Sequence, residues 1–215
     1  MATRGFFVTG TDTNVGKTVL SALLCAALEA IYWKPVQTGA VEGTDTERVR
    51  DWAALPAGRT RPEAYCFDPP VSPHLAARRA GVEIVLERIR LPEVPAGVPL
   101  VAEGAGGVLV PLNGRALMVD LMRQLGLPVL VAARSTLGTI NHTLLTVQAL
   151  RQAGLEPCGV VLIGPPDDDN RAAIEHYGRV RVLGQIPVLA AFTPETLRAT
   201  FAEHFDRQAL REALG

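Results

Sequence analysis

Apolar runs and amphipathic stretches alternate along most of the chain. Short runs rich in Val, Ile and Leu are typical of buried strands. We predict strands at residues 6–8, 31–36, 99–102, 127–133, 157–163 and 180–186. Stretches with apolar positions at helical spacing separate most of these runs. We predict helices at residues 19–30, 72–80, 82–89, 116–125, 139–153, 170–177, 194–205 and, on the surface, 207–214.

This alternation favours an α/β fold in which a mostly parallel sheet is covered by helices on both faces. In such sheets, ligands collect at the carboxyl ends of the strands. Pro and Gly are dense at residues 55–73 and 91–99, which indicates surface loops within one domain and not a linker between two. The length of 215 residues suits a single domain over residues 1–215.

A phosphate-binding loop is predicted between the first strand and the first helix. An apolar run leads into a polar turn, and Gly16-Lys17-Thr18 opens an Ala- and Leu-rich helix. In this context backbone N–H groups can surround phosphates, Lys17 can bridge them, and the Thr18 hydroxyl can reach Mg²⁺. Gly10 precedes Gly16 by one residue more than the usual loop pattern allows. The alternative interpretation is a chance Gly-Lys-Thr at an ordinary helix start.

Only two of the 21 basic residues are lysines, and each lies in a segment suited to phosphate chemistry. Lysine and arginine differ in shape, hydration and acidity, so this distribution favours a specific use of the ammonium group. Lys34 stands at the carboxyl end of the second predicted strand, which faces the phosphate loop in a parallel sheet. It could neutralise a transferring phosphoryl group or hold an anionic intermediate. The alternative is a solvated lysine at a strand end.

Two acids complete a possible magnesium site. Glu103 is predicted to end the third strand and precedes a glycine-rich segment, residues 104–107, that lets backbone N–H groups approach a substrate. A plain glycine-rich turn is the alternative. Asp45 follows the second strand and is as well explained as a helix N-cap. With Thr18 and a nucleotide, the two carboxylates would make an adequate site for hard Mg²⁺.

Composition excludes several other classes of function. A net charge of −1 gives no electrostatic reason to bind nucleic acid. There is no uninterrupted apolar stretch of about 18 residues, so no membrane span is expected. The three cysteines share no C-x-x-C spacing, and the cytosol fits them best. The four histidines are scattered, so zinc is not indicated, and a G-x-S-x-G elbow is absent.

Several segments in order closely resemble the dethiobiotin synthetase family. They are GTDTNVGKT (10–18), KPVQTG (34–39), EGAGG (103–107), LGTINH (137–142) and LGQIP (183–187). The resemblance covers nearly the whole chain, and the long phosphate loop is a feature of that family. It implies a P-loop NTPase-like fold and an ATP- and Mg²⁺-dependent enzyme that closes 7,8-diaminononanoate with CO₂ into the ureido ring of dethiobiotin. One amine would form a carbamate, the carbamate would take the γ-phosphoryl group of ATP, and the second amine would displace phosphate.

The resemblance also assigns roles to residues. Lys34 and Lys17 would be catalytic, with Lys34 stabilising the carbamate and phosphoryl oxygens. ATP would be bound by Asn14, Val15, Gly16, Lys17, Thr18, Val19 and Gly164. Mg²⁺ would be bound by Thr18, Asp45 and Glu103. The substrate would be bound by Thr13, Lys34, Thr38, Gly106, Leu137, Gly138, Thr139 and Asn141.

A homodimer is implied, because in the family the helix start after Leu137-Gly138 of the other subunit holds the substrate carboxylate. The chain departs from the family at Gly164, where an Asn commonly reads adenine, so base recognition must fall to backbone groups or be relaxed. Asp45 is the weakest of the metal assignments, because only residues 43–45 support the alignment there.

Two other classes of protein were weighed. A partitioning- or maturation-type P-loop ATPase switch would carry an extra lysine near the first glycine, but Thr11, Asp12 and Thr13 occupy that region. An amidating ligase of the cobyrinic acid type would need a glutaminase domain, and the remaining length has no room for one. The synthetase interpretation is therefore favoured.

Overall fold

The computed structural model describes residues 3–214, and its centre is a seven-stranded parallel sheet with the order β4-β2-β6-β1-β7-β8-β9. Its strand pairs are all parallel. The strands are β1 (Gly5–Gly10), β2 (Ile31–Trp33), β4 (Thr60–Arg61), β6 (Leu100–Gly107), β7 (Val129–Arg134), β8 (Pro157–Ile163) and β9 (Val182–Ile186). A second, two-stranded parallel sheet pairs β3 (Val36–Thr38) with β5 (Tyr65–Phe67).

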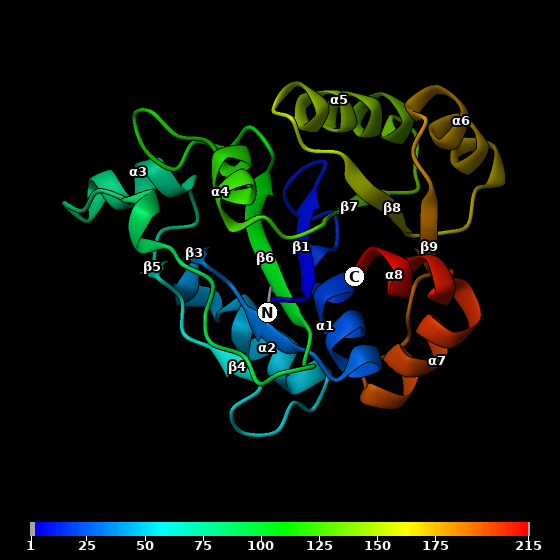
Figure 1. Cartoon of the computed structure of the whole chain (residues 1–215), viewed down its shortest axis with the longest axis horizontal. Coiled ribbons are helices and arrows are strands. Elements are labelled where there is room, and N and C mark those ends of the chain that lie inside the picture. The colour runs from blue at the N-terminus through cyan, green and yellow to red at the C-terminus, as the bar shows by residue number, and fades with distance from the viewer. Residues whose placement is uncertain (1–2, 215) are drawn as a thin grey trace.

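Helices cover both faces of the large sheet, as predicted (Figure 1). On one face lie α3 (Pro73–Arg79), α4 (Met118–Leu125), α5 (Thr139–Gln152) and α6 (Asp168–Gly178). On the other lie α1 (Lys17–Leu28), α2 (Asp45–Trp52), α7 (Pro194–His204) and α8 (Arg207–Leu214). The pleat of β1 divides its side chains between the two cores, since Phe7 packs on the first face while Phe6 and Val8 pack on the second. The predicted α/β class is confirmed.

The loop between β1 and α1 depends on one glycine. Gly16 is the N-cap of α1 and has a φ of 101°. A Cβ added there would come within 2.7 Å of the Ile163 side chain at the end of β8. Glycine therefore meets both requirements, the left-handed backbone and the close approach of the loop to the neighbouring strand. The start of α1 is fixed at the carboxyl edge of the sheet.

The strand predicted at residues 31–36 is interrupted. β2 ends at Trp33, and the chain continues into β3 of the small sheet after Lys34 and Pro35. Proline has no N–H to donate to a central ladder, so it marks the point where the chain leaves the large sheet. The short strands β4 and β5 lie in the region, residues 55–73, that the sequence indicated only as loop, and helix α2 (Asp45–Trp52) was foreseen only through the alternative that Asp45 is a helix N-cap.

Two other predicted boundaries were wrong. Residues 82–89 do not form an α-helix, and only a 3₁₀ turn, η2 (Leu86–Arg88), is present. The segment instead buries Ile84 and Ile89 completely, and its β-branched residues favour an extended backbone. Strand β6 does not end at Glu103 but continues through the glycines to Gly107. Pairing with β1, which places Gly107 opposite Gly10, overrides the low strand propensity of glycine there.

Candidate active site

A cavity of about 730 Å³ opens at the carboxyl ends of β1, β2 and β6. It is bounded by the β1–α1 loop, the first turns of α1, the segment after β2, helix α2 and the end of β6. The predicted site residues that line it are Thr13, Asn14, Gly16, Lys17, Thr18, Val19, Lys34, Thr38, Asp45, Glu103 and Gly106. The fold therefore gathers both lysines, both acids and the phosphate loop around one space.

Lys34 links the two acids of the site. Its Nζ lies 2.7 Å from Asp45 Oδ2 and 2.9 Å from Glu103 Oε1, and it donates to the Gly104 carbonyl oxygen at 3.1 Å. Only 3% of the side chain is exposed. Burial alone would lower the pKa of Lys34, but the two carboxylates outweigh it and raise this pKa above its ordinary value. Lys34 is a fixed ammonium group, contrary to the alternative of a solvated lysine.

Glu103 lies inside β6 and is completely buried. Its Oε1 accepts from Thr18 Oγ1 at 3.0 Å, and its Oε2 accepts from the Tyr32 hydroxyl at 3.0 Å. Sequence reasoning missed Tyr32, although it stands two residues before Lys34, a spacing that places both side chains on the same side of an extended chain. Burial, followed by the nearby Glu103 charge, raises the pKa of Tyr32 well above its ordinary value. Tyr32 therefore stays a neutral donor that fixes the carboxylate.

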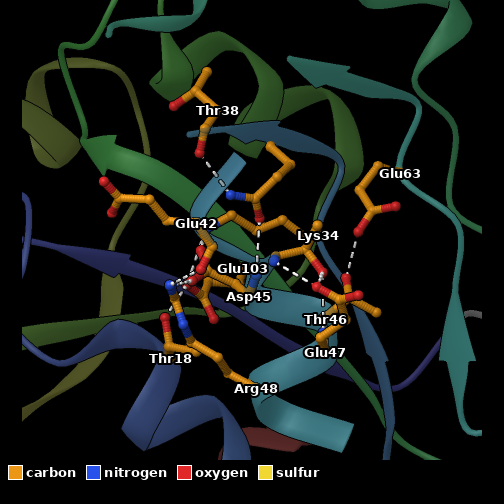
Figure 2. A network of polar contacts seen from close by, with 12 residues as sticks. Thr18, Lys34, Thr38, Glu42, Asp45, Thr46, Glu47, Arg48, Glu63 and Glu103 are labelled. Atoms are coloured by element: carbon orange, nitrogen blue, oxygen red, sulfur yellow. Dashed lines mark hydrogen bonds and ion pairs between the residues drawn. The ribbon is translucent and has the colours of Figure 1, made fainter. Parts of the chain in front are cut away.

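Asp45 is the first residue of α2, and its side chain turns into the polar network (Figure 2). The N-cap is Thr44, whose side chain forms a capping box with Glu47, so the alternative that Asp45 is the cap was wrong. Burial would raise the pKa of Asp45, but Lys34 outweighs it and this pKa is lowered. Asp45 is therefore ionised, and its Oδ2 pairs with the Lys34 ammonium group.

Two further residues around Asp45 were not found from the sequence. Arg48 donates to Asp45 Oδ1 at 3.1 Å and to the Glu42 carbonyl oxygen at 3.1 Å. The Gln37 Oε1 accepts from the Asp45 backbone N–H at 3.1 Å. Arg48 follows Asp45 at i+3, a spacing that places both on one face of a helix and could have indicated the pair.

The phosphate loop holds Lys17, a buried cation whose charge is unfavourable in the free protein. Lys17 is 7% exposed, and its Nζ donates to the Asp12 carbonyl oxygen at 3.0 Å. Burial and the nearby charge of Lys34 lower the pKa of Lys17 to about 8. Arg134, at the end of β7, donates to the Thr13 carbonyl oxygen at 3.2 Å and so holds the loop from the other side. An anion in the cavity would relieve the repulsion between the two ammonium groups.

Some predicted site residues lie outside this cavity. Val15 is buried in the hydrophobic core. The N–H of Gly164, just after β8, donates to the Ile186 carbonyl oxygen, and the Gly164 carbonyl oxygen accepts from the Gln185 side chain. The segment at the start of α5, residues 137–141, is likewise not part of the lining, and Leu137 there is fully exposed. These statements concern residues 3–214.

The oxygen set of Thr18, Asp45 and Glu103 is the candidate cation site. Over residues 3–214, no three His, Cys, Asp or Glu side chains form a group suited to a metal ion. Two carboxylates and one hydroxyl are, however, the hard ligands that Mg²⁺ combines with phosphate oxygens and water. Among the described helices, none has the length and apolar character to span a membrane.

Known proteins resemble the chain at two levels. A family described as an AAA domain matches residues 4–196. The ATP-dependent dethiobiotin synthetase BioD of Brucella melitensis biotype 2 is 49% identical over 198 residues, 92% of each protein. The biotin biosynthesis bifunctional protein BioCD of Bordetella avium is 55% identical over 187 residues, which are 86% of this chain but only 40% of that protein.

Solved structures with low identity share the fold alone. A ParA family ATPase of Chlorobium tepidum has a TM-score of 0.56 at 10% identity and covers 100% of this chain and 98% of its own. Chloroplast FtsY of Physcomitrella patens has a TM-score of 0.53 at 14% identity, covering 100% of this chain and 65% of its own. Since the 49% identity with BioD extends over almost the full length of both proteins, the chain belongs to the dethiobiotin synthetase family.

Proposed function

We propose that the protein is an ATP-dependent dethiobiotin synthetase of the cytoplasm that joins 7,8-diaminononanoate and CO₂ into the ureido ring of dethiobiotin, with release of ADP and phosphate. The observation that carries the proposal is the position of Lys34, buried between two carboxylates in the cavity that the phosphate loop also lines. The near-full-length similarity to BioD supports it.

The first step needs an anion to form next to a polyanion. One amine of the substrate loses a proton and adds to CO₂, which gives a carbamate. A carbamate oxygen then attacks the γ-phosphorus of ATP, and ADP leaves. Both reactants are negatively charged, so their approach is unfavourable without nearby positive charge. Lys34 and Lys17 provide that charge from two sides of the cavity, with Thr13, Thr38 and Gly106 beside the diamine.

The second step closes the ring. The product of phosphoryl transfer is a mixed carbamic-phosphoric anhydride, and the second amine attacks its carbonyl carbon. Phosphate leaves with the electron pair of the C–O bond, and the amine gives up its proton. Lys34 remains beside the oxygens on which charge develops, so its contribution is larger in the transition state than in the ground state.

Mg²⁺ fits the oxygen set described above. We propose that Thr18, Asp45 and Glu103 hold it, with the remaining ligands supplied by phosphate oxygens and water. When bound, the ion neutralises charge on the triphosphate. Lys34 contacts both acids and so keeps them at the cavity wall, and Tyr32 donates to Glu103 from behind.

We further propose that the protein acts as a homodimer in which the start of α5 holds the substrate carboxylate of the partner's site. Gly138 has a φ of 93°, and the Thr139 N–H donates to the Thr136 carbonyl oxygen, so the next N–H groups of this 14-residue helix, those of Ile140 and Asn141, are the ones offered to an anion. Leu137 and Asn141 are exposed next to it. Thr139 is the first helical residue.

A mixing experiment tests this arrangement. Asn141→Asp adds a negative charge that should repel the substrate carboxylate, while an acid in the first turn favours the helix itself. Lys34→Ala should inactivate the site in its own subunit. If each site combines both subunits, mixing and exchanging the two variants restores activity to about a quarter of that of wild type, because one site in each mixed dimer is intact. No recovery, with subunit exchange shown by mass spectrometry, would place the carboxylate contact within one subunit.

The pH dependence of ATP binding should report Lys17. The pKa of Lys17 is lowered to about 8 in the free protein, and bound phosphate would raise it again. Binding should therefore take up about half a proton at pH 8, and affinity should fall up to about tenfold per pH unit above pH 8. Calorimetry in buffers of different ionisation enthalpy measures the uptake. Lys17→Met should remove it, and an equal uptake in this variant would assign the titration to another group.

The direct test is product formation. Purified protein is incubated with ATP, MgCl₂, bicarbonate and 7,8-diaminononanoate, and dethiobiotin is sought by mass spectrometry. We expect dethiobiotin only when all four are present. An equal rate of ATP hydrolysis with and without the diamine, with no dethiobiotin formed, would instead favour a nucleotide-switch ATPase.

A further inference from the structure

Both carboxylate oxygens of Asp45 are paired with cations of the protein itself. Asp45 Oδ2 lies 2.7 Å from Lys34 Nζ, and Asp45 Oδ1 accepts from Arg48 Nη1 at 3.1 Å. Figure 2 shows the two cations reaching this carboxylate from different elements, Lys34 from the segment after β2 and Arg48 from α2. A divalent cation bound to either oxygen would stand directly beside a positive charge and be repelled by it. We therefore expect one of the two pairs to open when the ion enters.

The two cations differ in their freedom to move. Lys34 is 3% exposed and is also bonded to Glu103, so it has no room to leave. Arg48 is 42% exposed, and its second contact is a hydrogen bond of 3.1 Å to the Glu42 carbonyl oxygen. Glu42 ends a single 3₁₀ turn, η1 (Ala40–Glu42), in which no residue is buried. A long and half-exposed side chain leaves such a pair at small cost, so Arg48 is the cation that can be exchanged.

The charged side chains that line the cavity balance one another in the free protein. Three are cations and three are carboxylates, namely Lys17, Lys34 and Arg48, and Glu42, Asp45 and Glu103. A divalent cation that enters alone adds two positive charges to this set. A triphosphate that enters with the ion brings more negative charge than the ion neutralises, and it gives the released guanidinium an anion to face.

From this arrangement we propose that Arg48 is a positioning residue that holds Asp45 in the free protein and is exchanged there for the divalent cation, so that a bare cation binds weakly and the ion enters with the triphosphate. The inference rests on the proposed magnesium site at Asp45. The i+3 spacing lets one turn of α2 carry both the metal ligand and its removable partner. Asp45 is thus kept in place at the start of the helix before the ion arrives.

Mn²⁺ binding to the protein without nucleotide tests the exchange. Mn²⁺ prefers the same oxygen ligands as Mg²⁺, and the sharp paramagnetic resonance signal of the free ion is lost when it binds. Arg48→Met removes the guanidinium group and keeps much of the aliphatic stem. We expect this variant to bind Mn²⁺ about tenfold more tightly than wild type, because a competitor for the carboxylate and a repelling charge are both removed. A gain in affinity cannot result from a failure to fold.

Arg50→Met is the matched control. Arg50 lies on the same helix, is 52% exposed, pairs with Asp51 at 3.0 Å and is not part of the cavity lining. The control variant loses the same charge from α2, and it should bind Mn²⁺ with the affinity of wild type. Adding Asp45→Asn to Arg48→Met should abolish the gain, which assigns the tighter site to Asp45.

Three results of these titrations would overturn the inference. The first is the same Mn²⁺ affinity in wild type and Arg48→Met, which includes no measurable binding by either protein. The second is a gain of equal size in Arg50→Met, since it would reflect the charge of the whole helix. The third is a gain that persists after Asp45→Asn, since the ion would then bind elsewhere.

The displacement itself can be observed in the wild-type protein. A guanidinium group that is bonded through both Nη atoms rotates slowly, so its Nη–H signals can be detected by nuclear magnetic resonance at low temperature. The signals of Arg48 are identified by their absence from Arg48→Met. We expect MgCl₂ at saturation to remove them and EDTA to restore them. Signals that persist at saturation would show that the ion binds beside an intact pair, contrary to the inference.

The outcome for this inference is separable from that of the proposed function. Mn²⁺ binding is measured without ATP, diamine or turnover, whereas dethiobiotin formation is measured in the unmodified protein. Dethiobiotin formation together with unaltered Mn²⁺ affinity in Arg48→Met would overturn the cation exchange alone. Tighter Mn²⁺ binding in Arg48→Met, with no dethiobiotin formed by wild type, would overturn the proposed reaction alone.

Discussion

Replacing Lys34 by alanine should lower turnover by about 10²- to 10³-fold while ATP still binds. The reason is that the Lys34 ammonium group faces the carboxylates of the site and not the phosphate loop itself, so its charge matters most when the phosphoryl group moves. Steady-state kinetics with the diamine, alongside calorimetric titration with ATP, separates the two effects. Near-normal turnover would remove Lys34 from the mechanism.

The experiment on Lys34→Ala needs a control for stability, because Lys34 is buried between two carboxylates. Without Lys34, Glu103 would lose its ion-pair partner and Asp45 would keep only Arg48. Removing one partner of a buried pair costs about 3–5 kcal/mol of stability. Loss of turnover in Lys34→Ala alone could then reflect a disturbed site. The double variant Lys34→Ala with Glu103→Gln removes both charges of one pair. It should recover much of the free energy of unfolding and none of the turnover.

Lys34→Arg examines the shape of the cation. A guanidinium group keeps the charge, but its planar fork is larger than an ammonium and does not suit a position that is 3% exposed. We expect turnover well below that of wild type and above that of Lys34→Ala. Equal turnover of Lys34→Arg and wild type would show that only the charge matters.

The fold was predictable to the extent that its signals are local. Hydrophobic periodicity predicted the main strands of the large sheet and most helices, because the apolar residues that each element buries recur at the period of a strand or a helix. The splitting of β2 from β3 at Pro35 has a local cause and was nonetheless missed. The extension of β6 through glycines to Gly107 was not predictable, since it depends on pairing with β1 on one side.

The candidate site, like the fold, was predictable in part. Lys17, Lys34, Thr18, Glu103 and Asp45 were chosen from the sequence, and the structure brings them to one cavity. That choice succeeded because carboxyl ends of parallel strands meet at one edge, so residues distant in sequence can be placed together from topology. Their proposed roles remain predictions that the experiments above test.

The missed residues depend on tertiary contacts that leave no motif. Tyr32 in β2 supports Glu103 from 71 residues away, and Gln37 in β3 accepts from the Asp45 N–H at the start of α2. An ordinary aromatic residue in an apolar run looks like core in the sequence, and only the fold shows its polar or exposed edge. The start of α5 is a different case, because its residues were assigned from the sequence and do not line the cavity, so their use across a dimer interface stays a prediction.

Replacing Lys17 should change binding and stability in opposite directions. In the free protein the charge of Lys17 is opposed by burial and by Lys34, as its lowered pKa of about 8 indicates. Lys17→Met keeps most of the aliphatic stem and removes the charge, so below pH 8 it should raise the free energy of unfolding by about 1–3 kcal/mol. The gain should shrink above pH 8, because wild-type Lys17 loses its proton there while the lysine of the unfolded chain keeps its own.

The same change should weaken ATP binding by 30-fold or more, on the order of 2–5 kcal/mol for a lost charge partner. Lys17→Ala should do the same, with the stability gain offset by the cavity it leaves. Thermal or denaturant unfolding without nucleotide, followed by calorimetry with ATP, measures both effects on one protein. Unchanged ATP affinity would contradict the assignment of the phosphate loop, whereas weaker binding without added stability would mean that the loop relaxes to solvate Lys17 in the free protein. The effects on stability and on ATP affinity are expected to have opposite signs. The buried charge of Lys17 destabilises the free protein, but it is compensated when the triphosphate binds.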